Sequence, residues 1–353
     1  MWAVTKASLT ATFRSPQSIF FSLFFPIVLI WIFGSLGRGG TPSFDVALEK
    51  TADTTNQLYT VLRQNPVLHF VDKKKKDIND ELSKGRIAAI IDIKRSDVLS
   101  SGPPYLVHLR TSSASQRDYQ QVLAAIKLSL NEMDKQKQSI ATITQTVEEG
   151  RRYTYIDFFL PGMIGFALIG SAVFGIAFTF YSLRETLVLK RMYSTPIKRQ
   201  YIILGESISK VIFNLLTVVV LIAFGHYAYG FFLANGWITF VNMMILSFIA
   251  LLVFIGFGFF ISGISRNQNV IPIYANLFMF PQYFLSGTFF PRNALPEFLQ
   301  PILKFLPLTA VNDAMRNVAF EGASLIACSE QIIILLVWGM VIYALTARFF
   351  KWE

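Results

Sequence analysis

The sequence contains little charge and one cysteine. Charged residues make up 15% of the 353 residues, against about 25% in soluble domains, whereas hydrophobic residues make up 53%. This balance is typical of a membrane protein. The single cysteine, Cys328, excludes an intrachain disulfide, and we interpret it as a buried thiol.

Motifs for nucleotide binding and for common hydrolytic chemistry are absent. No GxxxxGK[ST], HExxH or GxSxG pattern occurs, and cysteine and histidine residues do not form a paired ligand set. We therefore expect no catalytic residue, cofactor or metal in this chain. The net charge of +10 is interpreted as a signal of membrane orientation, with no nucleic-acid partner.

Six hydrophobic stretches are expected to span a membrane, at 19–36, 158–180, 211–234, 238–264, 270–290 and 332–347. Each is near the ~20 residues that a helix needs to cross the hydrocarbon. The stretches contain almost no Asp, Glu, Lys or Arg, which argues against coupling to protons or sodium ions. His226, near the outer end of the third stretch, is interpreted as a packed or interfacial residue.

The short basic connections predict the orientation. The segment 183–210, the N-terminus around Arg14, the connection 265–269 and the C-terminus all carry basic residues and fall on one side of the six spans. Positive charge in short loops marks the cytoplasmic face. We therefore expect a multi-pass protein of the bacterial cytoplasmic (inner) membrane with both termini in the cytoplasm.

The region 37–155 has the character of a soluble α/β domain and lies outside the membrane by the parity of the spans. Strands are predicted at 44–48, 67–71, 87–93 and 105–110, and helices at 55–63, at 77–84 and from about Ser115. The pattern leaves open whether the last helix continues through Ile140 and Ile143 toward the second span. The four lysines at 73–76 are interpreted as a solvated turn.

The cytoplasmic segment reads LRETLVLKRMYSTPIKRQYIILGES, 183–207. A basic helical pattern ends near Thr195, a plausible helix cap, and Pro196 suits the first position of a second helix. The segment either anchors on anionic lipid or docks on a partner. The candidate contact residues are Arg184, Glu185, Lys190, Arg191, Thr195, Pro196, Lys198 and Arg199.

Four stretches together resemble the permease subunits of type-2 ABC exporters, in the subgroup with a large extracytoplasmic domain between the first two spans. They are TATFRSPQ at 10–17 with Pro26 in the first span, LKRMYSTPIKRQYIILGE at 189–206, LSGTFFPRNALPEFLQ at 285–300 and LPLTAVNDAMRNV at 306–318. The family commonly has a basic residue after the last glycine of the second stretch, where this chain has Glu206.

The resemblance implies an α-helical polytopic fold with three parts. These are an amphipathic N-terminal helix and first span at 1–36, with Arg14 and Pro16 at the end of that helix; the extracytoplasmic domain at 37–155; and a five-span domain at 156–353. The last part contains the coupling loop 183–210 and a re-entrant segment, 291–318, after the fifth span. The re-entrant gate is assigned to Gly287, Pro291, Pro296, Pro307, Asp313 and Arg316, and Asp313 and Arg316 are spaced to pair on one helical face.

The resemblance also implies partners. Two ABC ATPase subunits would bind ATP and Mg, and a second permease copy or paralogue would complete the path. Membrane lipid surrounds the chain, and a periplasmic adaptor is an open candidate for the external domain. The many phenylalanines suggest an amphipathic or lipid-like cargo, with a path lined by Phe174, Phe178, Phe254, Phe257, Phe278 and Phe280.

Several alternatives stay open from the sequence. The chain could be a membrane-anchored sensor or scaffold with an extracytoplasmic binding domain, or a membrane enzyme using Asp313, Arg316 and His226. The segment 291–318 could be a peripheral interfacial hairpin. Ser171, Gly175 and Thr179 have the spacing of small residues at a helix contact, either in a dimer seam or within the chain. The cargo and the identity of the second permease are not predicted.

Overall fold

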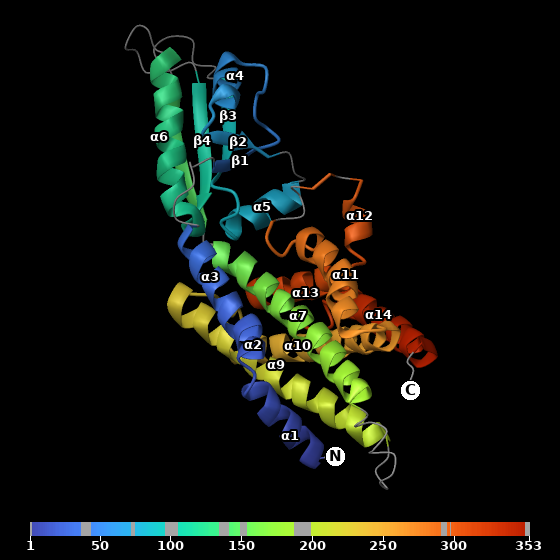
Figure 1. Ribbon diagram of the computed structural model, residues 1–353. Helices are drawn as coiled ribbons and strands as arrows, with labels where there is room; N and C mark the ends of the chain where they lie inside the picture. The colour runs from blue at the N-terminus through green and yellow to red at the C-terminus, as the bar shows by residue number, and fades with distance from the viewer. Residues whose placement is uncertain are drawn as a thin grey trace, which may run out of the picture. The chain divides into compact units, whose positions relative to one another are not determined.

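A computed structural model describes residues 2–36, 44–71, 75–95, 105–133, 141–148, 154–186, 199–290, 295–296 and 298–349. The chain divides into two compact units (Figure 1). The membrane unit comprises Met1–Arg38 and Tyr155–Glu353, and the inserted unit comprises Gly39–Thr154. Each unit has its own hydrophobic core.

The inserted unit is built on a five-stranded sheet with the order β2-β1-β3-β4-β5. The strands are β1 (Phe44–Leu48), β2 (Leu68–Phe70), β3 (Ala89–Arg95), β4 (Tyr105–Ser112) and β5 (Ala141–Glu148). β1 is parallel to β2 and β3, β4 is antiparallel to β3, and β5 is parallel to β4. The four predicted strands are confirmed.

Helices cover both faces of this sheet. On one face, α4 (Gln57–Gln64) and α6 (Gln116–Met133) pack on alternate strand residues such as Val46, Ile91 and Leu109. On the other face, Ile78 and Leu82 of α5 (Lys75–Ser83) pack on Ala47 and Ile90. This alternation follows the two-residue period of a strand. Figure 1 shows α6 lying along the strands.

The last helix of this unit does not continue toward the membrane. α6 is described to Met133, and Ile143 lies in strand β5. The segment ATITQTVE alternates β-branched and polar residues, which favours a strand, and it pairs along its whole length with β4. The open extension of this helix is therefore wrong at Ile143, and Ile140 lies outside the described residues.

The membrane unit is helical. It begins with α1 (Trp2–Phe13), α2 (Pro16–Ile19), the π-helix η1 (Phe20–Phe24) and α3 (Phe25–Leu36). It continues with α7 (Tyr155–Glu185), α9 (Arg199–Tyr229), α10 (Trp237–Ile264), the 3-10 turn η3 (Gln268–Val270) and α11 (Ile271–Leu285). It ends with α12 (Gln300–Leu303), α13 (Pro307–Glu321) and α14 (Ser329–Phe349).

Within the described ranges, four helices are long and apolar enough to cross a membrane. They are Tyr155–Glu185, Tyr201–Tyr229, Trp237–Ile264 and Ser329–Phe349, which correspond to four of the six predicted spans. The first predicted span contains the shorter apolar helix Ser22–Phe33. The fifth predicted span corresponds to α11, which has 15 residues. The chain is therefore a multi-pass membrane protein, and the full set of six spans stays a prediction.

The first predicted span contains a π-turn for a local reason. The backbone N–H of Phe25 donates to Phe20 O, five residues earlier. Pro26 follows directly, and a proline has no N–H and collides with the carbonyl four residues before it. A wider turn relieves this conflict while the chain stays helical from Pro16 to Leu36.

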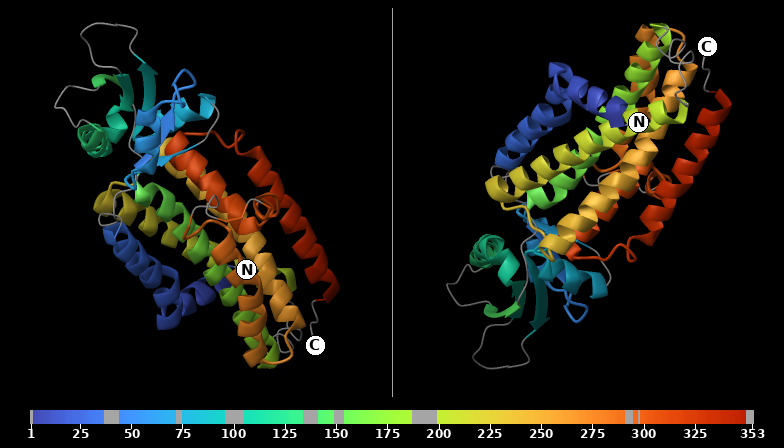
Figure 2. Two further views of the ribbon diagram at one scale, coloured as in Figure 1. Left: turned by 90° about the horizontal axis from the view of Figure 1, so that it is seen from above. Right: turned by 90° about the horizontal axis from the view of Figure 1, so that it is seen from below.

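The core of the membrane unit lies around α7 and α10, whose most apolar windows are 61% and 67% buried. In α14 only 11% of the corresponding window is buried, so most of this helix is left for lipid or another subunit to cover. Figure 2 shows α14 along one side of the bundle and the segment α1–α3 along the opposite side.

Helix α9 begins earlier than the third predicted span. It starts at Arg199, so the final residues of the predicted loop 183–210, including Glu206 and Lys210, are helical. Both side chains are more than 90% buried. α9 therefore extends the third predicted span toward the N-terminus by turns that carry two buried ionisable residues.

A substitution in the inserted unit tests the two-faced packing. Ile91 is fully buried under α4 and α6, so Ile91→Ala is expected to destabilise the unit by about 2–5 kcal/mol. Leu106→Ala on β4, where the side chain is 46% exposed, is the control and is expected to change stability by less than about 0.5 kcal/mol. Hydrogen exchange of the strand amides in the full-length protein measures both, and equal protection in the two variants would contradict the packing.

Candidate functional site

The end of α11 forms a sharp turn inside the membrane unit. Ser286 ends the helix, with its N–H donating to Gln282 O. Gly287 follows with φ of +74°, a left-handed conformation that favours glycine. The hydroxyls of Ser286 and Thr288 lie 2.9 Å apart and are both fully buried. The turn therefore brings polar groups into an apolar interior, where they need partners.

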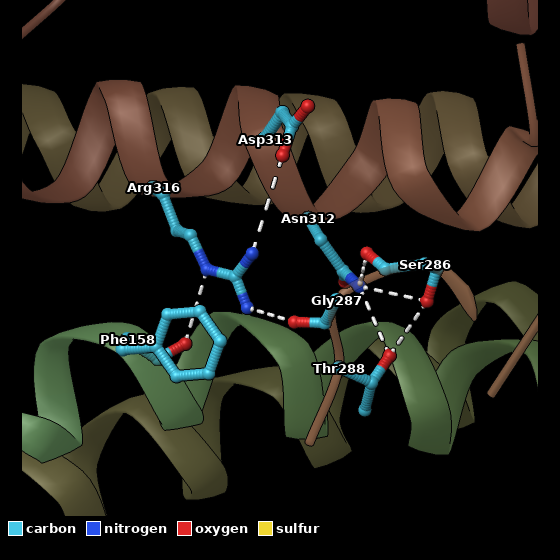
Figure 3. Close-up of polar contacts among 7 residues, drawn as sticks. All are labelled: Phe158, Ser286, Gly287, Thr288, Asn312, Asp313 and Arg316. Carbon is cyan, nitrogen blue, oxygen red and sulfur yellow. Dashed lines mark hydrogen bonds and ion pairs between the residues drawn. The ribbon is translucent and has the colours of Figure 1, made fainter. Parts of the chain in front are cut away.

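Asn312 of α13 supplies some of these partners. Its Nδ2 lies 3.0 Å from Thr288 Oγ1, 3.3 Å from Ser286 Oγ and 3.4 Å from Ser286 O (Figure 3). The side chain of Asn312 is fully buried. Gln282 Oε1 accepts a hydrogen bond from Leu308 N at 3.1 Å, so a residue of α11 caps the first turn of α13.

Arg316, one turn after Asn312, holds the same turn from the other side. Its Nη2 donates to Gly287 O at 2.6 Å and its Nε donates to Phe158 O of α7 at 3.1 Å (Figure 3). The guanidinium carbon lies 3.9 Å from the centre of the Phe158 ring, a cation–π arrangement. The expected partner, Asp313, lies 4.0 Å from Nη1, so the closest partners are backbone carbonyls.

We call the residues that hold this turn the polar anchor. It consists of Gln282, Ser286, Gly287, Thr288, Asn312 and Arg316, which come from α11, the following turn and α13. The anchor lies directly against α7. A Cβ atom on Gly162 would lie 2.7 Å from Thr288 O, and one on Gly165 would lie 2.5 Å from Asn312 Oδ1. Only glycine at these two positions leaves room for the anchor.

Further polar contacts fix the connection between α9 and α10. Asp157, buried at the start of α7, accepts a hydrogen bond from Phe232 N at 3.1 Å. His226 Nδ1 lies 2.8 Å from Phe231 O, and since a carbonyl only accepts, this nitrogen carries the proton. Ala234 N donates to Ala319 O at 2.9 Å, which joins the connection to α13.

Arg184, predicted to contact an ATPase, has a partner within the chain. Its Nη2 donates to Ser265 O at 2.7 Å, at the end of α10, and its guanidinium lies 5.2 Å from the centre of the Tyr181 ring. Glu185 is exposed at the end of α7. Arg199 is the first residue of α9. Lys190, Arg191, Thr195, Pro196 and Lys198 lie outside the described residues.

The remaining predicted site residues occupy separate places. Arg14 and Pro16 are exposed at the break between α1 and α2, with Pro16 as the first residue of α2. Pro307 is the first residue of α13, and Pro296 precedes α12. Pro291 lies outside the described residues. Of the predicted gate residues, the structure brings Gly287, Asp313 and Arg316 together.

Sequence reasoning missed most of the polar anchor. Gln282, Ser286, Thr288 and Asn312 were not singled out, and neither were Gly162 and Gly165 of α7. A signal was present, because α13 carries polar residues at positions 309, 312, 313 and 316, which recur at helical spacing among apolar residues. In a buried helix such spacing indicates one polar face.

The fold and the site define a multi-pass membrane protein whose helices enclose a buried polar turn. A family model described as "ABC-2 family transporter protein" matches residues 16–348, and the chain therefore belongs to this family. The predicted relation to permease subunits of type-2 ABC exporters is confirmed.

Three relatives illustrate the similarity. The chain is 21% identical over 357 residues to the linearmycin resistance permease protein LnrN of Bacillus subtilis (strain 168), covering 91% of each chain. It is 26% identical over 208 residues to ABC transporter G family member 20 of Dictyostelium discoideum, covering 57% of this chain and 28% of that protein. It is 26% identical over 142 residues to the probable multidrug ABC transporter permease YbhR of Escherichia coli (strain K12), covering 40% of this chain and 38% of that one.

A substitution on α7 tests the fit of the anchor. Gly165→Ala places a Cβ 2.5 Å from Asn312 Oδ1 and is expected to destabilise the membrane unit by about 1–3 kcal/mol, because overpacking displaces the anchor. Gly339→Ala is the matched control, since its Cβ would meet Val253 at an ordinary 3.7 Å. Thermal unfolding in detergent compares the variants, and a Gly165→Ala protein as stable as the control would contradict the close fit.

Proposed function

We propose that this chain forms one half of an ABC exporter, completed by a second copy or a paralogue and powered by two separate ATPase subunits. The observation that carries the proposal is the family match over residues 16–348, together with the end-to-end alignment to an ABC permease. In this proposal ATP and Mg bind to the partner subunits. The permease converts their closure into movement of its helices.

The proposed topology has six spans in a bacterial cytoplasmic membrane, with both termini inside. The continuous helical segment Pro16–Leu36 supports the first span, and α11 with the turn after it supports the fifth. The basic connections support the orientation. In this topology the inserted unit is extracytoplasmic and the segment 291–318 enters the membrane from outside.

The polar anchor is proposed to close the outer end of the transport path. A non-helical turn at membrane depth is tolerated where protein satisfies its backbone groups. Arg316 and Asn312 satisfy those groups at Gly287 and Ser286, and Arg316 also ties the turn to α7 through Phe158 O. A movement of α7 relative to α13 would break the hydrogen bond from Arg316 to Phe158 O and separate the guanidinium from the Phe158 ring, and this would distinguish a held from a released state of the turn.

The proposed cargo is amphipathic or lipid-like. Of the phenylalanines predicted to line the path, Phe254 is fully buried and Phe257 stacks on Phe278 with ring centres 3.7 Å apart, so these residues pack within the chain. Phe280 and Phe284 of α11 are 52% and 61% exposed and offer apolar surface to a cargo or a second subunit. The names of LnrN and YbhR refer to linearmycin resistance and to multidrug transport.

Charge reversal tests the partnership with an ATPase. The variant with Lys190→Glu and Arg191→Glu is expected to lose an ATPase subunit that co-purifies with the unchanged chain, because it reverses the charge of the proposed docking surface. Arg348→Glu, at the exposed end of α14, is the control and is expected to retain the subunit. The proposal fails if the unchanged chain never retains an ATPase, or if the chain alone hydrolyses ATP.

Release of the anchor tests the outer gate. Arg316→Met removes two hydrogen bonds to backbone carbonyls, and each bond to a charged group contributes about 1.5–3 kcal/mol. Without ATP, leakage of a small fluorescent dye from vesicles containing the protein is expected to rise about tenfold or more. Lys304→Met, an exposed cation in the same segment, is the control. Equal leakage from both variants would contradict the gate.

A further inference from the structure

The N-terminal helix α1 packs on α9 through polar residues. Thr5 and Thr12 are buried, whereas Trp2 is 71% and Phe13 is 47% exposed. Thr5, Ser8 and Thr12 recur at helical spacing and define one polar face. The side of α1 that faces α9 therefore presents hydroxyl groups, while the exposed side carries Trp2 together with the polar residues Lys6 and Thr10.

The face of α9 that contacts α1 carries two ionisable residues. Ser8 Oγ donates to Glu206 Oε2 at 2.6 Å, and Lys210 Nζ donates to Thr12 Oγ1 at 3.0 Å. Thr12 Oγ1 in turn donates to Ser8 O at 3.0 Å, so one connected set of hydrogen bonds joins both helices. Glu206 and Lys210 are 8% and 7% exposed.

The two cross-helix contacts are in register. Each joins residues 198 positions apart, and each helix advances by four residues between the contacts, so α1 and α9 run in the same direction. Just beyond these contacts, the ring of Phe13, which follows Thr12, meets the ring of Phe213 edge-on with centres 5.3 Å apart. The Lys210 side chain also passes along α7, since a Cβ on Gly175 would lie 3.5 Å from its Cδ and Cε. Gly175 thus contributes to packing within the chain.

These contacts fix the register of α1 more strongly than apolar packing would. In a membrane, lipid tails solvate apolar side chains as well as a neighbouring helix does, so an apolar contact gives little resistance to sliding. A slide of α1 by one residue would leave Glu206 and Lys210 buried without these partners, which is strongly unfavourable. A buried polar contact is an attested way to specify one register between helices.

We propose that Ser8, Thr12, Glu206 and Lys210 form a register lock that makes α1 and the first turns of α9 a single rigid body. α9 begins directly after the connection 187–198, and α1 leads through Arg14 and Pro16 into the first predicted span. The four residues are positioning residues. Through them, movement of the connection reaches the first span, a consequence that rests on the proposed function.

Cysteine accessibility tests the lock without any partner. In a Cys328→Ala background, Thr5→Cys places a reporter at a position that is 1% exposed beside α9. Its reaction with N-ethylmaleimide is measured in the full-length protein in lipid nanodiscs. Ser8→Ala and Thr12→Val are each expected to raise the labelling rate about tenfold or more, because each removes a hydrogen bond to a charged group.

Two comparisons distinguish loss of the register lock from a general weakening of the packing between α1 and α9. Thr10→Val is the matched control, because Thr10 is exposed and its hydroxyl donates only within α1, to Lys6 O. Glu206→Gln keeps an acceptor for Ser8 and is expected to label close to the unchanged rate, whereas Glu206→Leu is expected to label faster. If Thr12→Val labels no faster than Thr10→Val, or if Gln and Leu at position 206 behave alike, the lock is refuted.

A second measurement addresses the consequence for transport. The variant with Ser8→Ala and Thr12→Val is expected to retain its ATPase subunit and ATP hydrolysis but to lose export of a fluorescent phospholipid analogue that the unchanged protein exports. Export equal to that of Thr10→Val would overturn the mechanical role. If the unchanged chain retains no ATPase, the proposed function fails, while the labelling result still decides the lock.

Discussion

A backbone that leaves a helix within an apolar bundle exposes carbonyl groups that need hydrogen-bond donors, and in this protein the Arg316 guanidinium meets that need. It donates to Gly287 in the turn after α11 and to Phe158 in α7, while it lies over the Phe158 ring. Arginine suits this place because its planar head carries five donors in a fixed arrangement. A lysine could satisfy one of these carbonyls but would leave the geometry of the turn unspecified.

Other features around the turn follow from this contact. The turn approaches α7 closely only because Gly162 and Gly165 lack side chains. Asn312 bonds to the hydroxyls of Ser286 and Thr288, and Gln282 caps the N-terminus of α13. Three helices are therefore joined by a few buried hydrogen bonds, which together are sensitive to a small displacement of any one helix. The register lock between α1 and α9 has the same character near the start of α9, where Glu206 and Lys210 each bond to a hydroxyl group of α1.

Much of the fold could be predicted from the sequence, because a long apolar run and an alternation of apolar and polar residues are strong signals. The apolar run predicted the helix Trp237–Ile264, and the alternation predicted the strand at 44–48. Strand β5 was missed because Ile140 and Ile143 continue a helical spacing, although the β-branched residues around Ile143 favour a strand. The start of α9 was misplaced because Glu206 and Lys210 resemble loop residues until the polar face of α1 is seen to cover them. Arg316 was identified, but its backbone partners depend on three-dimensional contacts that no local pattern contains.

The central claim is that Arg316 holds the turn after α11 against α7. Solid-state NMR of the protein in lipid, with nitrogen-15 in arginine side chains and carbon-13 in glycine carbonyls, measures this contact directly. The account predicts a measurable through-space dipolar coupling between an arginine side-chain nitrogen and a glycine carbonyl carbon, which disappears in the Arg316→Lys variant. The absence of any such coupling in the unchanged protein, or its persistence in that variant, would contradict the account.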